Sequence, residues 1–98
     1  MSKFRLEDLE YSLFVTEDAK KDFKKHLKKN NKQREIVEKK LDEILKNPGV
    51  YGEPLGGNLK GKYSLHINSH FVLIYEIDEE EKLVRVLKYD KHDKAYGL

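Results

Sequence analysis

The chain has 98 residues, a net charge of +2 and no cysteine. This length fits one domain over residues 1–98, and the absence of cysteine excludes disulfides, thiol nucleophiles and Cys-based zinc sites. No apolar run approaches the ~20 residues of a membrane helix, and the first residues lack the apolar core of a signal peptide. We therefore expect a cytoplasmic protein. No GxGxxG or GxxxxGK[ST] loop occurs, so we expect no cofactor.

Positive charge is concentrated between Lys20 and Lys46, where 11 basic and 5 acidic residues give a local balance of +6. A surface of this kind attracts polyanions such as nucleic acids. The same composition is typical of solvated helices with Glu–Lys pairs four residues apart. Composition alone leaves both interpretations open.

The first half of the chain predicts a strand followed by two helices. Residues 11–16 are apolar and β-branched, as in a strand, and Thr16 offers an N-cap oxygen for the first helix. The apolar stripe of that helix repeats every four positions, at Ala19, Phe23 and Leu27. The second helix carries a similar stripe and stops at Asn47-Pro48-Gly49.

Two segments are predicted to lack long regular elements. Residues 1–10 are interpreted as an N-terminal arm or a short first strand. Residues 47–61 hold five of the six glycines and both prolines, which predicts a long irregular loop. Loops of ~15 residues are uncommon in compact domains and are often functional.

Three strands are predicted in the second half. Residues 62–68 alternate between apolar and polar, residues 70–77 are almost all apolar, and residues 83–89 follow a charged turn. Residues 90–98 form a polar tail.

The order strand-helix-helix-strand-strand-strand predicts an α+β fold, in which a two-helix hairpin packs on one face of a small, largely antiparallel, twisted sheet. No helix is left for the other face. We therefore expect Lys62, Ser64 and His66 to be open to a partner.

The histidines of the sheet half suggest a chemistry. His66 ends one strand, His70 starts the next and His92 lies in the tail; a tight turn makes His66 and His70 neighbours, and its length decides whether they share a face. Cleavage of RNA needs a base for the ribose 2′-hydroxyl, an acid for the leaving 5′-oxygen, and cations for the phosphate. Imidazoles suit both proton transfers. Lys60 and Lys62 suit the third task, and no metal is required.

Each of these residues also has an ordinary structural explanation. A single histidine on a strand is usually a surface residue, and His26 on the first helix is assigned no function. Zinc is disfavoured, because HxxxH binds zinc on a helix and here it spans a hairpin. Lys60 and Lys62 can be solubility charges. Tyr96 can stack on a base or anchor the tail, and Phe71 can be a stacking platform or part of the core.

Three segments resemble the YafQ branch of the RelE/ParE toxin superfamily. They are Glu-Pro-Leu-Gly-Gly-Asn-Leu-Lys-Gly at 53–61, Leu-His-Ile-Asn-Ser-His-Phe-Val-Leu-Ile-Tyr at 65–75, and Lys-His-Asp-Lys-Ala-Tyr at 91–96. The family has a Pro-Leu-Gly loop, a hairpin with a histidine followed by an acidic and an aromatic residue, and a tail with a histidine and an aromatic. The motifs cover the last half of the chain, and the element order covers all of it.

The resemblance implies a toxin of a type II toxin–antitoxin system. Such a toxin is a metal-independent endoribonuclease that cuts mRNA, in many relatives in the ribosomal A site, and a cognate antitoxin holds it inactive. His66 matches the hairpin histidine, a general base or acid. His92 matches the tail histidine, with the complementary proton role or phosphate stabilisation. Tyr96 matches the aromatic that positions the substrate, and Phe71 replaces the family tryptophan.

Two departures from the family pattern leave the acid–base roles open. His70 replaces the carboxylate of the hairpin, and Glu53 replaces a loop histidine, so that Glu53 can be a base or only the residue before Pro54. The candidate catalytic residues are therefore His66, His70, His92 and Glu53. The candidate RNA contacts are Lys60, Lys62, Phe71, Lys88, Lys91 and Tyr96.

Two other functions remain open on the sequence. A ParE-like module inhibits a topoisomerase without doing chemistry, but such members generally lack this set of histidines. An inactive relative that only binds RNA or a partner protein is the second alternative, because two family residues are replaced.

Overall fold

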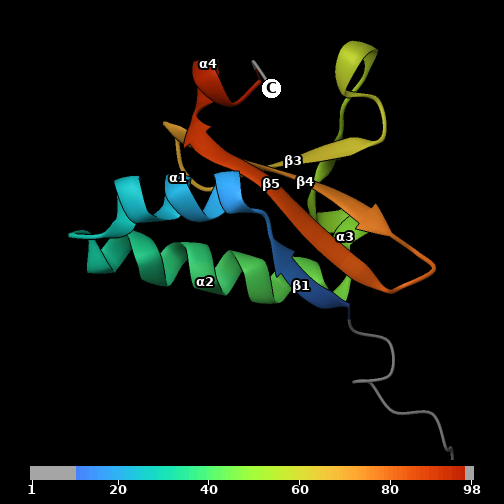
Figure 1. The fold of residues 1–98 in the computed structure, drawn as a ribbon, viewed down its shortest axis with the longest axis horizontal. Helices are drawn as coiled ribbons and strands as arrows, with labels where there is room; N and C mark the ends of the chain where they lie inside the picture. The colour runs from blue at the N-terminus through green and yellow to red at the C-terminus, as the bar shows by residue number, and fades with distance from the viewer. Residues whose placement is uncertain (1–10, 97–98) are drawn as a thin grey trace, which may run out of the picture.

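The computed structural model describes residues 11–96 (Figure 1). The arm or strand predicted over residues 1–10 lies outside this range. The elements are β1 (Ser12–Val15), α1 (Glu17–Leu27), α2 (Asn31–Lys46), α3 (Pro48–Tyr51), β2 (Glu53–Pro54), the 3-10 helix η2 (Gly57–Leu59), β3 (Lys62–His66), β4 (Phe71–Asp78), β5 (Leu83–Lys91) and α4 (His92–Ala95). The predicted α+β fold, with a helix hairpin against one sheet, is confirmed.

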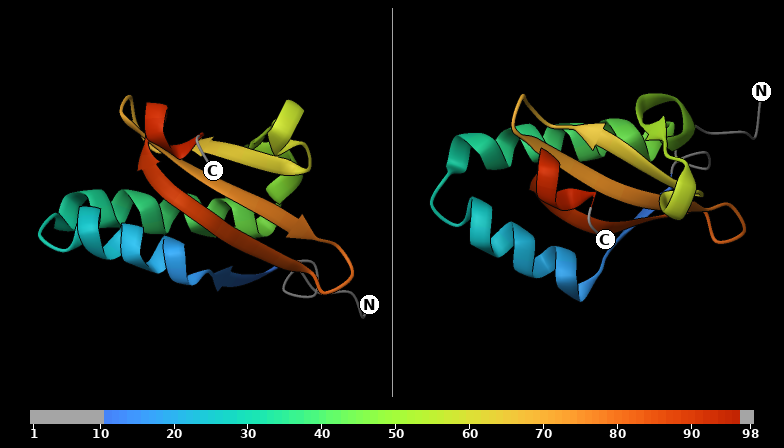
Figure 2. Two further views of the ribbon diagram at one scale, coloured as in Figure 1. Left: turned by 45° about the horizontal axis from the view of Figure 1, so that its top comes forward. Right: turned by 90° about the horizontal axis from the view of Figure 1, so that it is seen from above.

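The sheet has five strands in the order β1-β5-β4-β3-β2. The pairs β2–β3, β3–β4 and β4–β5 are antiparallel, while β1 runs parallel to β5. The first and last strands of the described range are therefore neighbours, as both views in Figure 2 show. The sheet is largely antiparallel, as predicted.

The two long helices begin at side-chain caps. The Ala19 N–H donates to Oγ1 of Thr16 at 3.2 Å, and the Gln33 N–H donates to Oδ1 of Asn30 at 3.0 Å. Each bond satisfies one of the backbone donors that a helix leaves free in its first turn. The N-cap predicted at Thr16 is confirmed.

The main core lies between the helix hairpin and one face of the sheet, which we call the helix-covered face. Buried apolar side chains of three strands meet those of both long helices there. The members from the strands are Leu65, Leu73, Tyr75, Val84, Val86 and Tyr89. Fully burying a side chain of this size contributes about 1.5–3 kcal/mol, so this layer supplies most of the hydrophobic stabilisation.

The other face, which we call the α4 face, is partly covered, and the expectation that no helix lies there was wrong. Figure 1 shows α4 above the sheet, on the side away from α1 and α2. Ala95 and Tyr96 pack on Val72 and Ile74, and Leu55 joins this second cluster. A helix of four residues has too few positions for a periodic pattern, so the sequence of the tail gave no sign of it.

Residues 47–61 are more regular than predicted. This segment contains α3, β2 and η2 instead of one irregular loop. The Tyr75 hydroxyl donates to the carbonyl oxygen of Pro48 and so attaches α3 to the sheet. The prediction failed because tertiary contacts, rather than local propensity, hold these short elements. Over residues 11–96, no helix is long and apolar enough to cross a membrane.

Candidate functional site

The imidazole rings of His66 and His92 lie beside one another on the α4 face. Their centroids are 5.3 Å apart, with ring planes at 33°. His66 is the last residue of β3 and His92 the first of α4, and both side chains are exposed. Two rings at this separation are close enough for one small group to reach nitrogen atoms of both.

Tyr96 extends this pair. Its ring meets the His92 ring edge-on, with centroids 5.0 Å apart, and it also packs on the Val72–Ile74 cluster. Tyr96 therefore both anchors α4 and presents an aromatic surface beside the histidines. The two roles that the sequence left as alternatives are geometrically compatible.

His70 joins the site through the backbone. The His92 N–H donates to the His70 carbonyl oxygen at 2.8 Å, and both residues line an open cavity of about 520 Å³. The other residues that line it are Ser69, Phe71, Lys91 and Asp93. His66 pairs with Val72 across the ladder, so His70 lies beyond the last pair, in the turn. The turn thus brings His70 to His92 rather than stacking it on His66.

Glu53, Lys60 and Lys62 lie farther along the sheet. Glu53 is opposite Ser64 in the β2–β3 ladder, which places its exposed side chain on the α4 face. Lys62 is on the same face as His66 but four residues away, roughly 13 Å at ~3.3 Å per residue. Lys60 precedes it in the turn after η2. These cations are therefore at the far end of β3 from the histidine pair.

The remaining predicted contacts separate into two groups. Phe71 faces the helices, where its ring stacks on Tyr89 with centroids 5.1 Å apart. Nζ of Lys88 lies 3.5 Å from Oδ1 of Asp22 on α1, so its charge is already engaged. Lys91 is exposed and lines the cavity with His70 and His92. Of the predicted lysines, Lys91 is the one beside the histidines.

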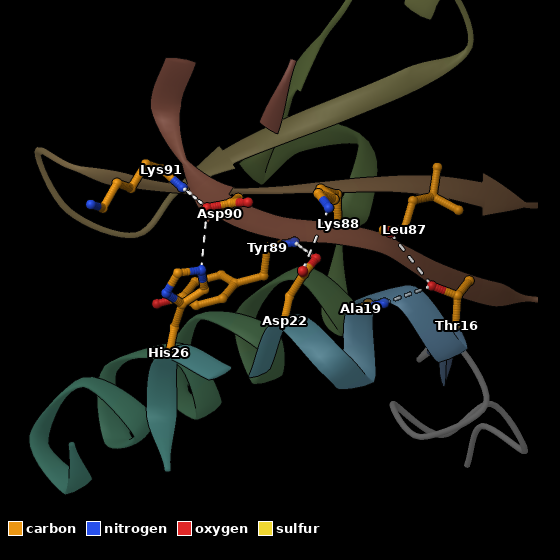
Figure 3. Close-up of polar contacts among 9 residues, drawn as sticks. All are labelled: Thr16, Ala19, Asp22, His26, Leu87, Lys88, Tyr89, Asp90 and Lys91. Carbon is orange, nitrogen blue, oxygen red and sulfur yellow. Dashed lines mark hydrogen bonds and ion pairs between the residues drawn. The ribbon is translucent and has the colours of Figure 1, made fainter. Parts of the chain in front are cut away.

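Sequence reasoning missed a set of polar residues along the edge of β5 that faces α1, drawn in Figure 3. Asp22 and Asp90 are each 8% exposed, and Nε2 of His26 lies 3.2 Å from Oδ1 of Asp90. Burial raises the pKa of Asp90, but the Lys91 N–H, His26 and nearby lysines outweigh this and hold it below its usual value. Asp22 and His26 occupy the stripe of α1 that also holds Ala19 and Leu27. Polar residues on a buried stripe were the available signal.

The arrangement supplies two adjacent imidazoles and a lysine that lines a cavity with one of them. Over the described range, no group of three or more His, Cys, Asp or Glu side chains is placed to hold a metal ion. Neutral and protonated imidazoles can together accept one proton and donate another near neutral pH. The chemistry that these side chains offer is acid–base catalysis on an anionic substrate.

Comparison with known proteins gives a family. The family model for the ParE toxin of the type II toxin–antitoxin system parDE matches residues 13–96. A Methanosarcina mazei protein of uncharacterized function is 43% identical over 86 residues, which are 88% of this chain and 99% of the relative.

Solved structures agree with this assignment. The RelBE2 toxin–antitoxin complex of Mycobacterium tuberculosis contains a chain that is 26% identical, with a TM-score of 0.72, covering 86% of this chain and 93% of that one. YafQ from Escherichia coli strain BL21(DE3) has a TM-score of 0.70 at 23% identity, covering 89% and 99%. The second likeness shows that the fold is shared.

Proposed function

Because the chain belongs to the ParE toxin family of type II toxin–antitoxin systems, within the RelE/ParE superfamily, we propose that it is a metal-independent endoribonuclease that cleaves mRNA on the ribosome. A cognate antitoxin is its protein partner, by analogy with the complex of the Mycobacterium tuberculosis relative. A ribosomal substrate implies action in the cytoplasm. The proposal depends on one observation, the 5.3 Å separation of the His66 and His92 rings.

The proposed reaction uses the substrate's own nucleophile. One imidazole of the pair removes the proton of the ribose 2′-hydroxyl, whose oxygen attacks the adjacent phosphorus. The bond from phosphorus to the 5′-oxygen breaks, and the other imidazole protonates that oxygen. The products are a 2′,3′-cyclic phosphate and a free 5′-hydroxyl.

The neighbouring residues have supporting roles in this proposal. Lys91 stabilises the charge that develops on the phosphate, and the His70 side chain contacts the RNA from the cavity it shares with His92. Tyr96 stacks on a base or holds the sugar. Glu53, Lys60 and Lys62 lie along the rest of the α4 face, where they would meet the RNA beyond the cleaved bond. Lys88 is not assigned a role, because Asp22 engages it.

The test is primer extension on mRNA that is being translated in a purified system with the wild-type protein. We expect discrete cleavage, and it should be unchanged when the protein has first been stripped of metal with EDTA and dialysed, because the proposed reaction uses no metal bound to the protein. His66→Ala and His92→Ala should each reduce the rate by about 10² or more. Glu80→Ala, an exposed residue at the opposite end of the sheet, is the control and should cleave normally. Intact mRNA with the wild-type protein, or full cleavage by the His66→Ala/His92→Ala double variant, would contradict the proposal.

A second candidate follows from the family model, which is that of ParE. A ParE-like toxin inhibits a topoisomerase and needs no proton transfer. Expression without an antitoxin distinguishes the two functions. Cleaved mRNA with intact DNA supports the nuclease, whereas damaged DNA with intact mRNA supports the topoisomerase inhibitor.

A further inference from the structure

The helix α1 continues the sheet edge where β1 ends. The last pair between β1 and β5 is Val15 with Val86, and beyond it the backbone of β5 faces α1 (Figure 3). The Tyr89 N–H donates to Oδ2 of Asp22 at 3.0 Å. A helix side chain thus satisfies a strand donor that would otherwise be buried without a partner. We call the contacts of Asp22 and His26 on α1 with Tyr89 and Asp90 on β5 the polar seam.

Asp90 forms the end of the polar seam. Its side chain is almost fully buried, and Oδ1 accepts the Lys91 N–H at 2.7 Å. His26 faces the same oxygen at 3.2 Å, in a charge contact rather than a directed hydrogen bond. The His26 ring is itself fixed edge-on against Phe71, with centroids 4.9 Å apart. A buried carboxylate is costly unless it is paired, and here one of the two partners, the Lys91 N–H, belongs to the residue that precedes α4.

The residues after Asp90 carry the proposed chemistry. Lys91 is the N-cap position of α4 and His92 its first residue. Asp90 Oδ1 holds the N–H of Lys91, and the His70 carbonyl oxygen holds the N–H of His92. A helix of four residues is too short to be stable alone. The place of the His92 ring therefore depends on how the chain is held at residues 90–92.

We propose that Asp90, fixed by His26, is a positioning residue that sets the His92 ring against His66. Asp90 itself contacts no substrate in this scheme. The inference rests on the proposed nuclease function for its kinetic readout. Its structural readout, the contact between the two rings, is independent of that function.

The polar seam contains a matched control. Asp22 and Asp90 have the same exposed fraction, and each accepts a backbone N–H of β5. Each also has one basic side chain within 4 Å, Lys88 for Asp22 and His26 for Asp90. Asp22 accepts the N–H of Tyr89, two residues before the end of β5, whereas Asp90 accepts the N–H of Lys91 at the junction with α4. The comparison is therefore between Asp90→Ala and Asp22→Ala. A third variant, Asp90→Asn, keeps an oxygen for the Lys91 N–H.

The experiment measures single-turnover cleavage against enzyme concentration at a temperature where all variants are folded. It also records nuclear Overhauser contacts between the rings of His66 and His92. For Asp90→Ala we expect a maximal rate reduced about 10- to 100-fold, the scale of a small misplacement of a catalytic group. The enzyme concentration that gives half of the maximal rate should change less than twofold, and the contact between the rings of His66 and His92 should be lost. Asp22→Ala should lower the melting temperature but keep the rate and the contact. Asp90→Asn should retain most of the wild-type maximal rate and most of the contact between the two rings.

Three results would overturn the positioning role. They are an unchanged ring contact in Asp90→Ala, equal losses of rate in Asp90→Ala and Asp22→Ala, or no recovery in Asp90→Asn. If Asp90→Ala does not fold, the comparison is made between Asp90→Leu and Asp22→Leu, which keep the side-chain volume and remove the acceptor of the backbone N–H. A loss of ring contact specific to Asp90→Leu supports the role, and its absence opposes it. If the wild-type protein does not cleave RNA, the nuclease proposal fails, and the ring contact alone decides the positioning role.

Discussion

The hydroxyl group of Tyr75, in the middle of the central strand β4, donates a hydrogen bond to the carbonyl oxygen of Pro48, the first residue of α3. The Tyr75 side chain is fully buried, and burial raises the pKa of its hydroxyl well above the usual value. Gly52 lies directly against this ring and hydroxyl. The start of residues 47–61 is thus positioned by one buried phenol.

Substituting Gly52 tests how closely this contact is packed. A Cβ at residue 52 would overlap the Tyr75 hydroxyl and ring, so Gly52→Ala should destabilise the protein by about 1–3 kcal/mol. Urea denaturation measures the loss. Gly49→Ala is the control, because a Cβ there has nothing within 4 Å, and it should be neutral or stabilising by about 0.4–1 kcal/mol. Equal effects at both positions would contradict the packing argument.

The N-cap of α1 should make a measurable contribution to stability. Thr16→Ala removes the acceptor of the Ala19 N–H, and a loss of about 1 kcal/mol in the free energy of unfolding is expected. Thr16→Ser keeps the hydroxyl and should retain most of the stability. Urea denaturation of the two variants and the wild type measures this contribution. A Thr16→Ala variant as stable as the wild type would show that the cap contributes nothing.

The lowered pKa of Asp90 predicts that the stability of the fold depends on pH. Because its pKa is lower in the folded state than the ordinary value, the folded chain binds fewer protons at this site than the unfolded chain. The stabilisation is therefore present above the ordinary pKa of about 3.9 and is lost as the pH falls through the lowered folded value.

The measurement compares the wild type with Asp90→Asn at two pH values. At pH 7 the wild type should be more stable, by about 1–3 kcal/mol. Near pH 3 the difference should shrink, because asparagine does not titrate. The groups that lower this pKa by their charge are His26, Lys88 and Lys25, and none of them is changed. A difference that is the same at both pH values would show that the charge of Asp90 does not stabilise the fold.

Ser64 gives a prediction of the opposite sign. Its side chain is 1% exposed, and its Oγ has no hydrogen-bond partner within residues 11–96. A buried hydroxyl without a partner is unfavourable, so Ser64→Ala should leave the melting temperature unchanged or raise it. A clear drop in melting temperature would mean that the hydroxyl has a partner after all.

The long elements could be predicted from the sequence because each carries several periods of its pattern. The stripe of α1 and the cap at Thr16 fix one helix, and the alternation from Lys62 onwards fixes β3. The short elements could not be predicted. The helix α4 depends on contacts between Tyr96 and Val72, which are distant in the sequence, and the same is true of Tyr75 and Pro48.

The candidate site was predicted only in part, because contacts between residues distant in the sequence could not be predicted. The pair of His66 and His92 was expected from a family motif, and the structure places the rings together. The positions of the lysines relative to them depend on register and turn geometry, so Lys62 lies at the other end of its strand. His26 and Asp90 are 64 positions apart, and their contact follows only from how α1 lies along β5. The catalytic roles of His66 and His92 remain predictions.

The parallel pairing of β1 with β5 has a consequence for the synthesis of the protein. Within the described residues, β1 joins the sheet only through β5, which is made last. A nascent chain must therefore keep its first strand unpaired until translation has passed residue 83, and the histidine pair cannot form before residue 92 exists. Translation that terminates earlier therefore releases a product without the β1–β5 pairing and without the contact between the rings of His66 and His92.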